Sequence, residues 1–290
     1  MNLIGQEAGL LAQTGSRGIP FVPIPDHTLI RKIGVGSYGE IWLARNAFGT
    51  YRAVKIVYRR NFVHERPFER ELSGIKKYEP ISRSQDGLMD ILQVGRNDQA
   101  GYFYYVMELA DDVASGPAIN PDHYEPRTLA DDIVKRGRLP FEECLSIGLA
   151  LTSALAHLHR RGLVHRDVKP SNVIFVNGVP ELADIGLVTD MDEARTYVGT
   201  EGFIPPEGPG TAQADVYSLG KVLYEISTGK DRFEYPELPD DLGEAENQRE
   251  LIALNHIVIR SCRADPHKRY PSADKMHADL LQLQQGHAVN

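Results

Sequence analysis

The chain has few of the features that mark secreted, membrane-spanning or nucleic-acid-binding proteins. Its only cysteines are Cys144 and Cys262, too few for a disulfide-rich scaffold, and their apolar surroundings indicate free thiols in a reducing compartment. No apolar run approaches the ~18 residues of a membrane span, and no basic region followed by an apolar stretch opens the sequence. The net charge of −8 and the lack of a basic cluster argue against nucleic acid or an anionic membrane as the main partner.

What remains is an ordinary globular composition. Apolar residues make up 42% and charged residues 25% of the 290 positions, so the chain can bury a sizeable core, in one large domain or in two lobes. We expect a soluble, cytoplasmic protein. The alternative is that the chain is the soluble part of a longer, membrane-tethered protein.

The stretch richest in reactive side chains lies between residues 165 and 186. Its first segment, 165–172, reads His-Arg-Asp-Val-Lys-Pro-Ser-Asn, and a turn at 184–186 reads Asp-Ile-Gly. Between them, two apolar runs flank the pair Asn177-Gly178. This pair favours a two-residue hairpin turn, because both of its residues must take a positive φ. The sequence therefore predicts a β-hairpin with polar residues at its open end.

Folding the chain at this turn places Asn172 opposite Ala183. Asn172 and Asp184 then lie together, beside Asp167 and Lys169. One amide and one carboxylate oxygen suit Mg²⁺, which keeps several waters and takes further ligands from substrate phosphates. The second carboxylate, Asp167, remains free to accept a proton from an incoming hydroxyl.

The segment and the turn resemble the catalytic loop and metal-binding turn of the protein kinases, H-R-D-x-K-x-x-N and D-F-G. The resemblance implies an α+β, bilobal fold, with a small antiparallel β-sheet lobe plus one helix and a larger, mainly α-helical lobe. The compact loops and a Pro-Pro-Glu variant of A-P-E look like those of bacterial, eukaryotic-type serine/threonine kinases. The implied division is an N-terminal extension at 1–27, an N-lobe at 28–107, a hinge at 108–112, a C-lobe at 113–285 and a tail at 286–290.

A glycine-rich segment separates two strand-like runs at 28–33 and 40–45. Glycine lets the backbone close over phosphates without a Cβ in the way. No helix follows the glycines, which argues against a dinucleotide-binding βαβ unit and for the glycine-rich hairpin of a kinase. The resemblance places around the nucleotide Ile33, Gly34, Val35, Gly36, Ser37, Tyr38, Gly39 and Ile41, with Ile174 from the later hairpin.

The next strand, 51–58, carries Ala53 and Lys55 on one face, because side chains alternate along a strand. A small alanine leaves room for a flat base, and the lysine can reach the α- and β-phosphates. The run Arg-Ala-Val-Lys that ends at Lys55 looks like the family's V-A-I-K.

A helix is predicted over residues 59–77, and Glu71 lies beside its apolar stripe. In the family a helix glutamate holds the strand lysine on the phosphates. We expect Glu71 to pair with Lys55, with Glu69 and Glu65 as alternatives.

By resemblance, the hinge follows two further strands, at 91–95 and 102–107. Met107 is then the gatekeeper, and the backbone C=O of Glu108 and N–H of Ala110 bond the adenine edge. Ribose hydroxyls are assigned to Asp111 or Asp112. Residues 113–127 are longer than expected at this point of a kinase, and their role stays open.

Four helices are predicted in the larger lobe, at 138–162, 214–228, 248–262 and 272–285. The first is a rigid base for the catalytic loop. By resemblance, Asp215 braces that loop from below, and Arg269 pairs with Glu207.

The segment after the Asp-Ile-Gly turn contains several hydroxyl groups. By resemblance, Thr200 bridges Asp167 and Lys169 at the substrate-facing turn. The candidate phosphorylation sites are Thr189, Thr196 and Tyr197.

The resemblance implies an ATP- and Mg²⁺-dependent kinase that phosphorylates serine or threonine hydroxyls of protein substrates, including itself. Asp167 accepts the proton, Lys169 neutralises the transferred group, and Lys55 orients the phosphates. A lysine two residues after the catalytic aspartate is typical of serine/threonine rather than tyrosine kinases.

Two positions depart from the family pattern. Ile185 replaces a phenylalanine, which predicts looser packing on the Glu71 helix, and Pro205 replaces an alanine, which stiffens its corner. Neither removes a chemical group, so activity is predicted. The alternatives are a pseudokinase that binds nucleotide or serves as a scaffold, and a small-molecule phosphotransferase.

Overall fold

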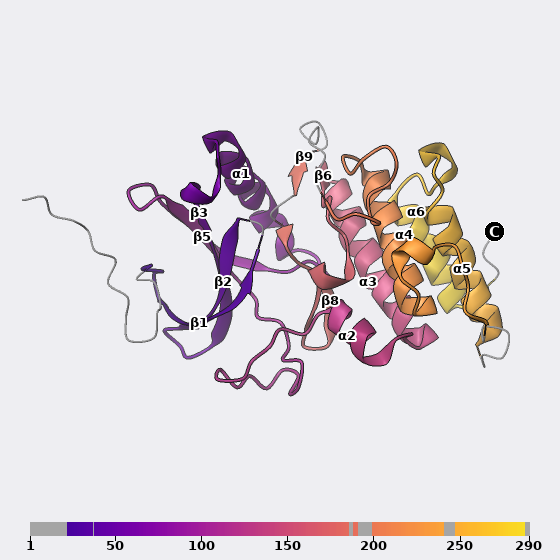
Figure 1. Ribbon diagram of the computed structural model, residues 1–290, viewed down its shortest axis with the longest axis horizontal. Helices are drawn as coiled ribbons and strands as arrows, with labels where there is room; N and C mark the ends of the chain where they lie inside the picture. The colour runs from indigo at the N-terminus through magenta and orange to yellow at the C-terminus, as the bar shows by residue number, and fades with distance from the viewer. Residues whose placement is uncertain (1–21, 37, 186–187, 191–198, 241–246, 288–290) are drawn as a thin grey trace, which may run out of the picture.

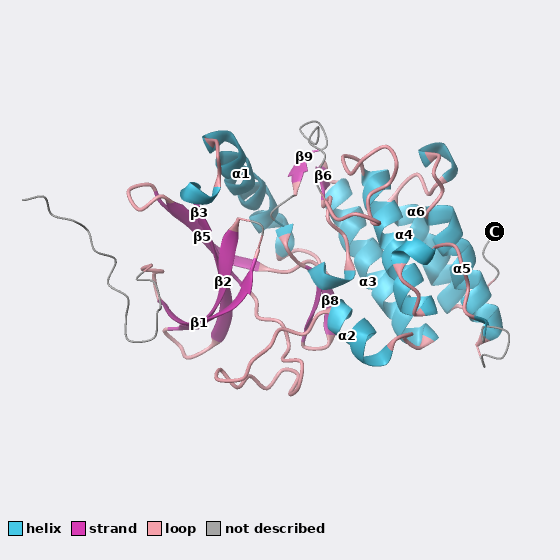
Figure 2. Cartoon of the chain, viewed as in Figure 1, coloured by secondary structure: helices cyan, strands magenta, loops and turns pink. Residues whose placement is uncertain are grey.

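The computed structural model describes residues 22–36, 38–185, 188–190, 199–240 and 247–287. A sheet-based N-terminal lobe and a helical C-terminal lobe lie side by side along the long axis (Figure 1). Strands dominate the first lobe and helices the second (Figure 2). The predicted N-terminal extension lies outside the described residues as far as residue 21, as do the last three residues of the predicted tail.

The N-terminal lobe is built on one antiparallel sheet of five strands, in the order β1-β2-β3-β5-β4. The strand predictions are confirmed, with the first strand extending into the glycine-rich loop as far as Val35. The strands are β1 (His27–Val35), β2 (Gly39–Asn46), β3 (Tyr51–Tyr58), β4 (Ile91–Asn97) and β5 (Tyr102–Met107).

One helix, α1 (Glu65–Ser82), packs against this sheet. It begins later than predicted because Arg59–Asn61 forms a separate 3-10 turn, and it runs on to Ser82 with Pro80 in its last turn. Its buried stripe of Phe68, Leu72 and Ile75 joins the main hydrophobic core. The opposite face of the sheet carries a second apolar cluster, to which residues 22 and 24 contribute.

The C-terminal lobe is assembled around α3, whose leucines at 151, 155 and 158 are fully buried. Helices α4 and α6 pack directly on it, and α5 packs on α4. A short helix, α2, was not predicted from the sequence, although Thr128 forms a capping box with Asp131 at its start. The helices are α2 (Leu129–Arg136), α3 (Phe141–His159), α4 (Ala212–Thr228), α5 (Gln248–Ser261) and α6 (Ala273–Gln284).

The predicted hairpin is confirmed. Strand β7 (Val173–Val176) pairs with β8 (Val179–Leu182), and the turn residues Asn177 and Gly178 have φ of 50° and 79°. Ala183 N–H donates to Asn172 C=O at 2.8 Å, so the two ends lie opposite each other as expected. Nearby, the short strands β6 (Leu163–Val164) and β9 (Thr189–Asp190) pair and hold the start of the following segment against the catalytic loop.

Candidate active site

A cavity of about 390 Å³ lies between the lobes, and most of the predicted nucleotide-binding residues line it. Those from the N-terminal lobe and the hinge are Ile33, Gly34, Val35, Gly36, Ile41, Ala53, Lys55, Met107, Glu108 and Ala110. Those from the C-terminal lobe are Asn172, Ile174 and Asp184. A second cavity, of about 380 Å³, lies by the hinge and the turn between β2 and β3, and no catalytic side chain lines it.

Three predicted residues do not line the nucleotide cavity. The ring of Tyr38 stacks on Phe62 with centroids 4.5 Å apart. Gly39 is required by strand packing, since a Cβ there would lie 2.3 Å from the carbonyl oxygen of Ile56. Glu71 lies behind Lys55, and Ser37 is outside the described residues. By contrast, a Cβ on Gly36 would come 3.2 Å from the ammonium nitrogen of Lys55, so this glycine leaves room for the lysine head group.

Three side chains converge on Asp167, which is 8% exposed. Lys169 Nζ lies 2.8 Å from Asp167 Oδ2 and donates to Thr200 Oγ1, also at 2.8 Å. Thr200 Oγ1 in turn donates to Asp167 Oδ1 at 2.8 Å, and Asn172 Nδ2 donates to Asp167 Oδ2 at 2.9 Å. These contacts fix the direction of the Asp167 carboxylate. A group that accepts a proton from an incoming hydroxyl needs such a fixed orientation.

Asp215, at the start of α4, holds the loop that carries Asp167. The side chain of Asp215 is only 1% exposed. Its carboxylate accepts hydrogen bonds from the backbone N–H groups of His165 and Arg166, both at 2.8 Å. His159 Nε2, from the end of α3, lies 2.9 Å from the same carboxylate. The bracing role predicted for Asp215 is thus visible in the contacts. Arg269 likewise pairs with Glu207 through both of its terminal nitrogens.

Lys55 pairs more closely with Asp184 than with Glu71. Lys55 Nζ lies 2.9 Å from Asp184 Oδ1 and 3.9 Å from Glu71 Oε1. Burial alone would lower the pKa of Lys55, but Tyr105, Asp184 and Glu71 raise it above its usual value. This lysine is a fixed positive charge in the cavity.

Glu71 is buried, and neither of its carboxylate oxygens has a hydrogen-bond partner among the described residues. Burial raises the pKa of Glu71 to about 7, with the charge of Lys55 acting in the opposite direction. Asp184 has the reverse balance. Burial would raise its pKa, but the charge and hydrogen bond of Lys55 lower it below its usual value. Glu71 is close enough to become the main ion-pair partner of Lys55 if Asp184 binds another cation instead.

The donor set fits Mg²⁺. Asn172 uses its amide nitrogen on Asp167, so the amide oxygen is the atom that remains for a metal ion. Asp184 lines the same cavity with a partly exposed carboxylate. Within the described part of the chain, no group of three or more acidic, histidine or cysteine side chains gathers in a metal-binding arrangement. Two protein oxygens suit an ion that takes its other ligands from water and phosphate.

The ribose assignment of Asp111 and Asp112 is not supported. Asp111 accepts the backbone N–H groups of Asn177 and Gly178 at 2.9 and 2.7 Å and thereby anchors the hairpin turn. Asp112 accepts three backbone N–H groups, those of Ala114, Ser115 and Glu125, within the loop that follows. Burial would raise the pKa of Asp112, but these hydrogen bonds lower it to about 2. Both carboxylates therefore organise the backbone.

Sequence reasoning missed several residues of the cavity wall, among them Tyr124 and Pro126. Both belong to residues 113–127, whose role had stayed open. The three prolines in this segment were the only signal that it has a fixed shape. The candidate phosphorylation sites Thr196 and Tyr197 lie outside the described residues, as does Gly186.

Residues 27–286 match the family model described as "Protein kinase domain". The chain belongs to the protein kinase domain family. The predicted family and fold class are therefore confirmed.

The curated proteins that this chain resembles include bacterial serine/threonine kinases. One is a probable serine/threonine-protein kinase of Clostridium perfringens, 28% identical over 89% of this chain and 38% of its own. Serine/threonine-protein kinase PrkC of Bacillus subtilis is 25% identical over 88% of this chain and 40% of its own. Serine/threonine-protein kinase PknB of Mycobacterium leprae is 30% identical over 59% of this chain and 31% of its own. The chain thus spans about two fifths or less of the length of these relatives.

No helix among the described residues is long and apolar enough to cross a membrane. The cytoplasmic location stays a prediction, as do the domain boundaries.

Proposed function

We propose that the protein is an ATP- and Mg²⁺-dependent kinase that phosphorylates serine and threonine hydroxyls of protein substrates, including its own. The observation that carries this proposal is the fixed Asp167 carboxylate, held by Lys169, Thr200 and Asn172 next to the interlobe cavity. The names of the relatives, all serine/threonine kinases, support the choice of acceptor.

Each charged group of the site has a separate task. Lys55 orients the α- and β-phosphates, with Glu71 behind it. Asp184 and Asn172 would hold Mg²⁺, which supplies positive charge against the phosphates. Asp167 accepts the proton of the acceptor hydroxyl, and Lys169 offsets charge on the transferred phosphoryl group. Positioning and electrostatics carry most of the rate enhancement in such a reaction.

A third cavity, of about 420 Å³, supports a polypeptide acceptor. It opens beside Lys169 and Thr200 and continues past Phe203 towards the end of α4. Glu225 and Arg232 lie on its wall and pair with each other, with 3.3 Å between Arg232 Nη1 and Glu225 Oε1. A groove that continues away from the catalytic groups suits an extended chain better than a small metabolite.

Incubation with Mg²⁺ and γ-labelled ATP, alone and with a generic protein acceptor, tests the proposal. We expect label on serine and threonine of the wild type and no label with Asp167→Asn. A wild type that binds ATP but labels neither itself nor any acceptor would favour the pseudokinase. Label that appears only in small molecules would favour the small-molecule phosphotransferase.

A further inference from the structure

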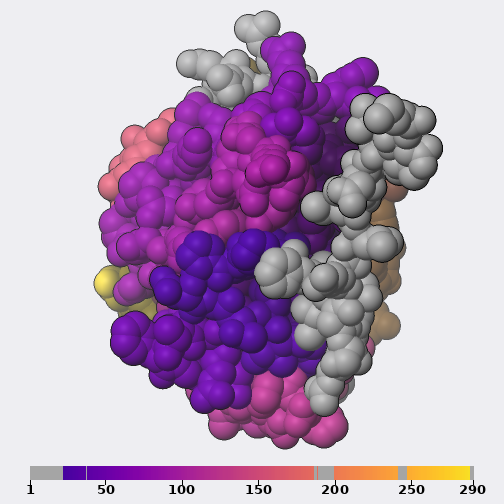
Figure 3. Space-filling view, turned by 90° about the vertical axis from the view of Figure 1, so that its left-hand side faces the viewer, coloured from indigo at the N-terminus to yellow at the C-terminus, as the bar shows by residue number. Residues whose placement is uncertain are grey.

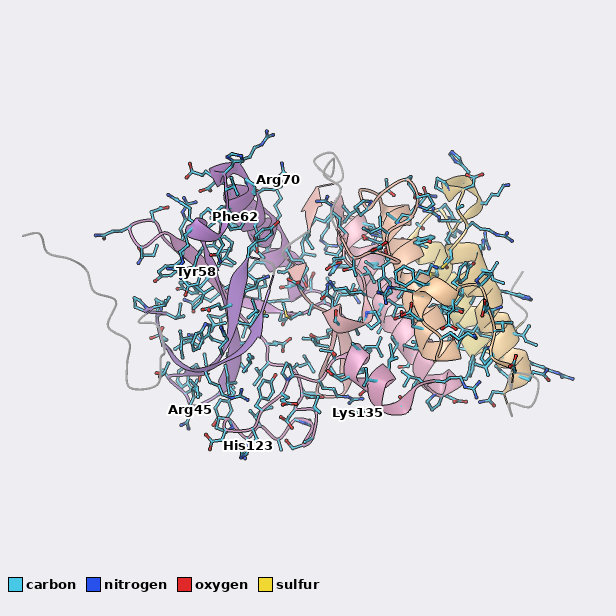
Figure 4. The ribbon with its side chains drawn as sticks, viewed as in Figure 1. Arg45, Tyr58, Phe62, Arg70, His123 and Lys135 are labelled. Carbon is cyan, nitrogen blue, oxygen red and sulfur yellow. The ribbon has the colours of Figure 1, made fainter. Side chains whose placement is uncertain are left out.

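The post-hinge loop (residues 113–127) forms one wall of the nucleotide cavity. Tyr124 and Pro126 line it, and Tyr124 is only 1% exposed. In the view of Figure 4, His123 marks the outer edge of this loop, between Arg45 of the N-terminal lobe and Lys135 of α2. The end-on view shows the magenta surface of residues after the hinge directly below the indigo strands (Figure 3). The loop therefore belongs to the nucleotide site as well as to the surface.

Hydrogen bonds hold Tyr124 from two sides. Its hydroxyl donates to the Ala110 carbonyl of the hinge at 3.0 Å. Arg31, on β1, donates through Nε to the Pro121 carbonyl at 2.8 Å and through Nη2 to the Tyr124 carbonyl. Arg31 lies two positions before Ile33, which lines the same cavity. The loop is thus tied both to the hinge and to the strand that leads into the glycine-rich loop.

The contact with Ala110 bears on base selection. Glu108 and Ala110 line the cavity at the hinge, so a base held there would meet three backbone groups in a row: the Glu108 C=O, the Ala110 N–H and the Ala110 C=O. Adenine presents an amino donor beside a ring acceptor, and this pair matches the first two groups. Guanine presents a carbonyl acceptor beside ring N–H and amino donors. It matches the hinge only one step further along, where its carbonyl meets Ala110 N–H and its donors meet Ala110 C=O.

We propose that Tyr124 determines the selection of adenine over guanine nucleotides, because its hydroxyl already takes one of the two lone pairs of the Ala110 carbonyl oxygen, and the two guanine donors need both. Arg31 is a positioning residue that keeps Tyr124 against the hinge. The inference rests on the proposed nucleotide site and concerns only which base that site accepts.

The test compares kcat/KM for Mg·ATP with that for Mg·GTP in the full chain. We expect the wild type to prefer ATP, and Tyr124→Phe to reduce the ATP-to-GTP ratio about tenfold, the effect of one hydrogen bond. Arg31→Gln should shift the ratio in the same direction by a smaller factor, mainly through the KM for each nucleotide. Melting temperatures of all variants show whether each one is folded.

We expect two matched controls to keep the wild-type ATP-to-GTP ratio. Tyr224→Phe removes another tyrosine hydroxyl that donates to a backbone carbonyl, that of Glu237, at 2.7 Å. Lys32→Gln removes the charge next to Arg31, where the lysine pairs with Glu40 at 3.3 Å.

A folded Tyr124→Phe protein with the wild-type ratio would overturn the inference, as would a wild type that uses GTP as well as ATP. Both results leave the proposed kinase activity standing. If the wild type transfers phosphate from neither nucleotide, the proposed function fails instead. Equilibrium binding of Mg·ATP and Mg·GTP then measures the same base selectivity without phosphoryl transfer.

Discussion

Helix α1 lies unusually close to the chain that follows the Asp184 turn, and Gly74 makes this approach possible. A Cβ at position 74 would lie 2.5 Å from the carbonyl oxygen of Val188, where ordinary contacts begin at 3.4 Å. Gly74→Ala must therefore separate the helix from this backbone by roughly 1 Å. Glu71 lies three residues earlier on the same helix, so it moves with it relative to Lys55.

A displacement of this size has a predictable effect on activity. A misplacement of about 1 Å costs on the order of 10²-fold in rate, so we expect kcat/KM for ATP to fall 10- to 100-fold. The helix itself gains stability from the substitution, since alanine is favoured over glycine by about 1 kcal/mol in a helix interior. Steady-state kinetics and thermal melting of the same samples separate the two effects.

The matched control is Ser73→Ala, at the exposed neighbouring position of α1. It gains helix propensity without any new contact, so it should keep wild-type kinetics. The reasoning is refuted if Gly74→Ala is as active as Ser73→Ala and melts at a higher temperature than the wild type.

Two further substitutions follow from the buried carboxylates. The pKa of Glu71 is about 7 in the folded protein, against a usual value of 4.5, so between pH 4.5 and pH 7 the folded state binds more protons than the unfolded state. The free energy of unfolding therefore falls by up to about 3 kcal/mol as the pH rises through this range. Glu71→Gln should remove this loss, so its melting temperature relative to wild type should rise from pH 5 to pH 7.5, and a constant difference would contradict the assignment. Asp215→Asn replaces one oxygen that accepts a loop N–H with an amide donor, which should cost about 1–3 kcal/mol of unfolding free energy in urea titrations together with much of kcat. Wild-type stability and kcat would exclude the bracing role.

The parts of the site that were predictable from sequence depend on local rules. The Asn177-Gly178 turn fixes the register of its hairpin, and that register alone brings Asn172 opposite Ala183. Alternation along β3 puts Lys55 on the cavity face. These site residues could be predicted because each rule links positions that are only a few residues apart in the sequence.

The parts that were missed depend on approaches between distant segments. Tyr124 reaches the cavity because Arg31, more than ninety positions earlier, holds its loop. The carboxylates of Asp111 and Asp112 were assigned to ribose because a sequence does not show which backbone N–H groups will lie beside them. The close contact of Gly74 with Val188 likewise leaves no mark in the local pattern, where a glycine inside a helix only lowers the propensity.

The central claim is that one cleft holds a magnesium nucleotide between Lys55, Asp184 and Asn172, facing Asp167. A crystal structure with Mg²⁺ and a non-hydrolysable ATP analogue tests it most directly. We predict that Asp184 and Asn172 bind the same ion, and that Lys55 leaves Asp184 for the phosphates and forms a hydrogen bond with Glu71. A triphosphate bound outside the cleft, with Lys55 still on Asp184, would contradict the claim.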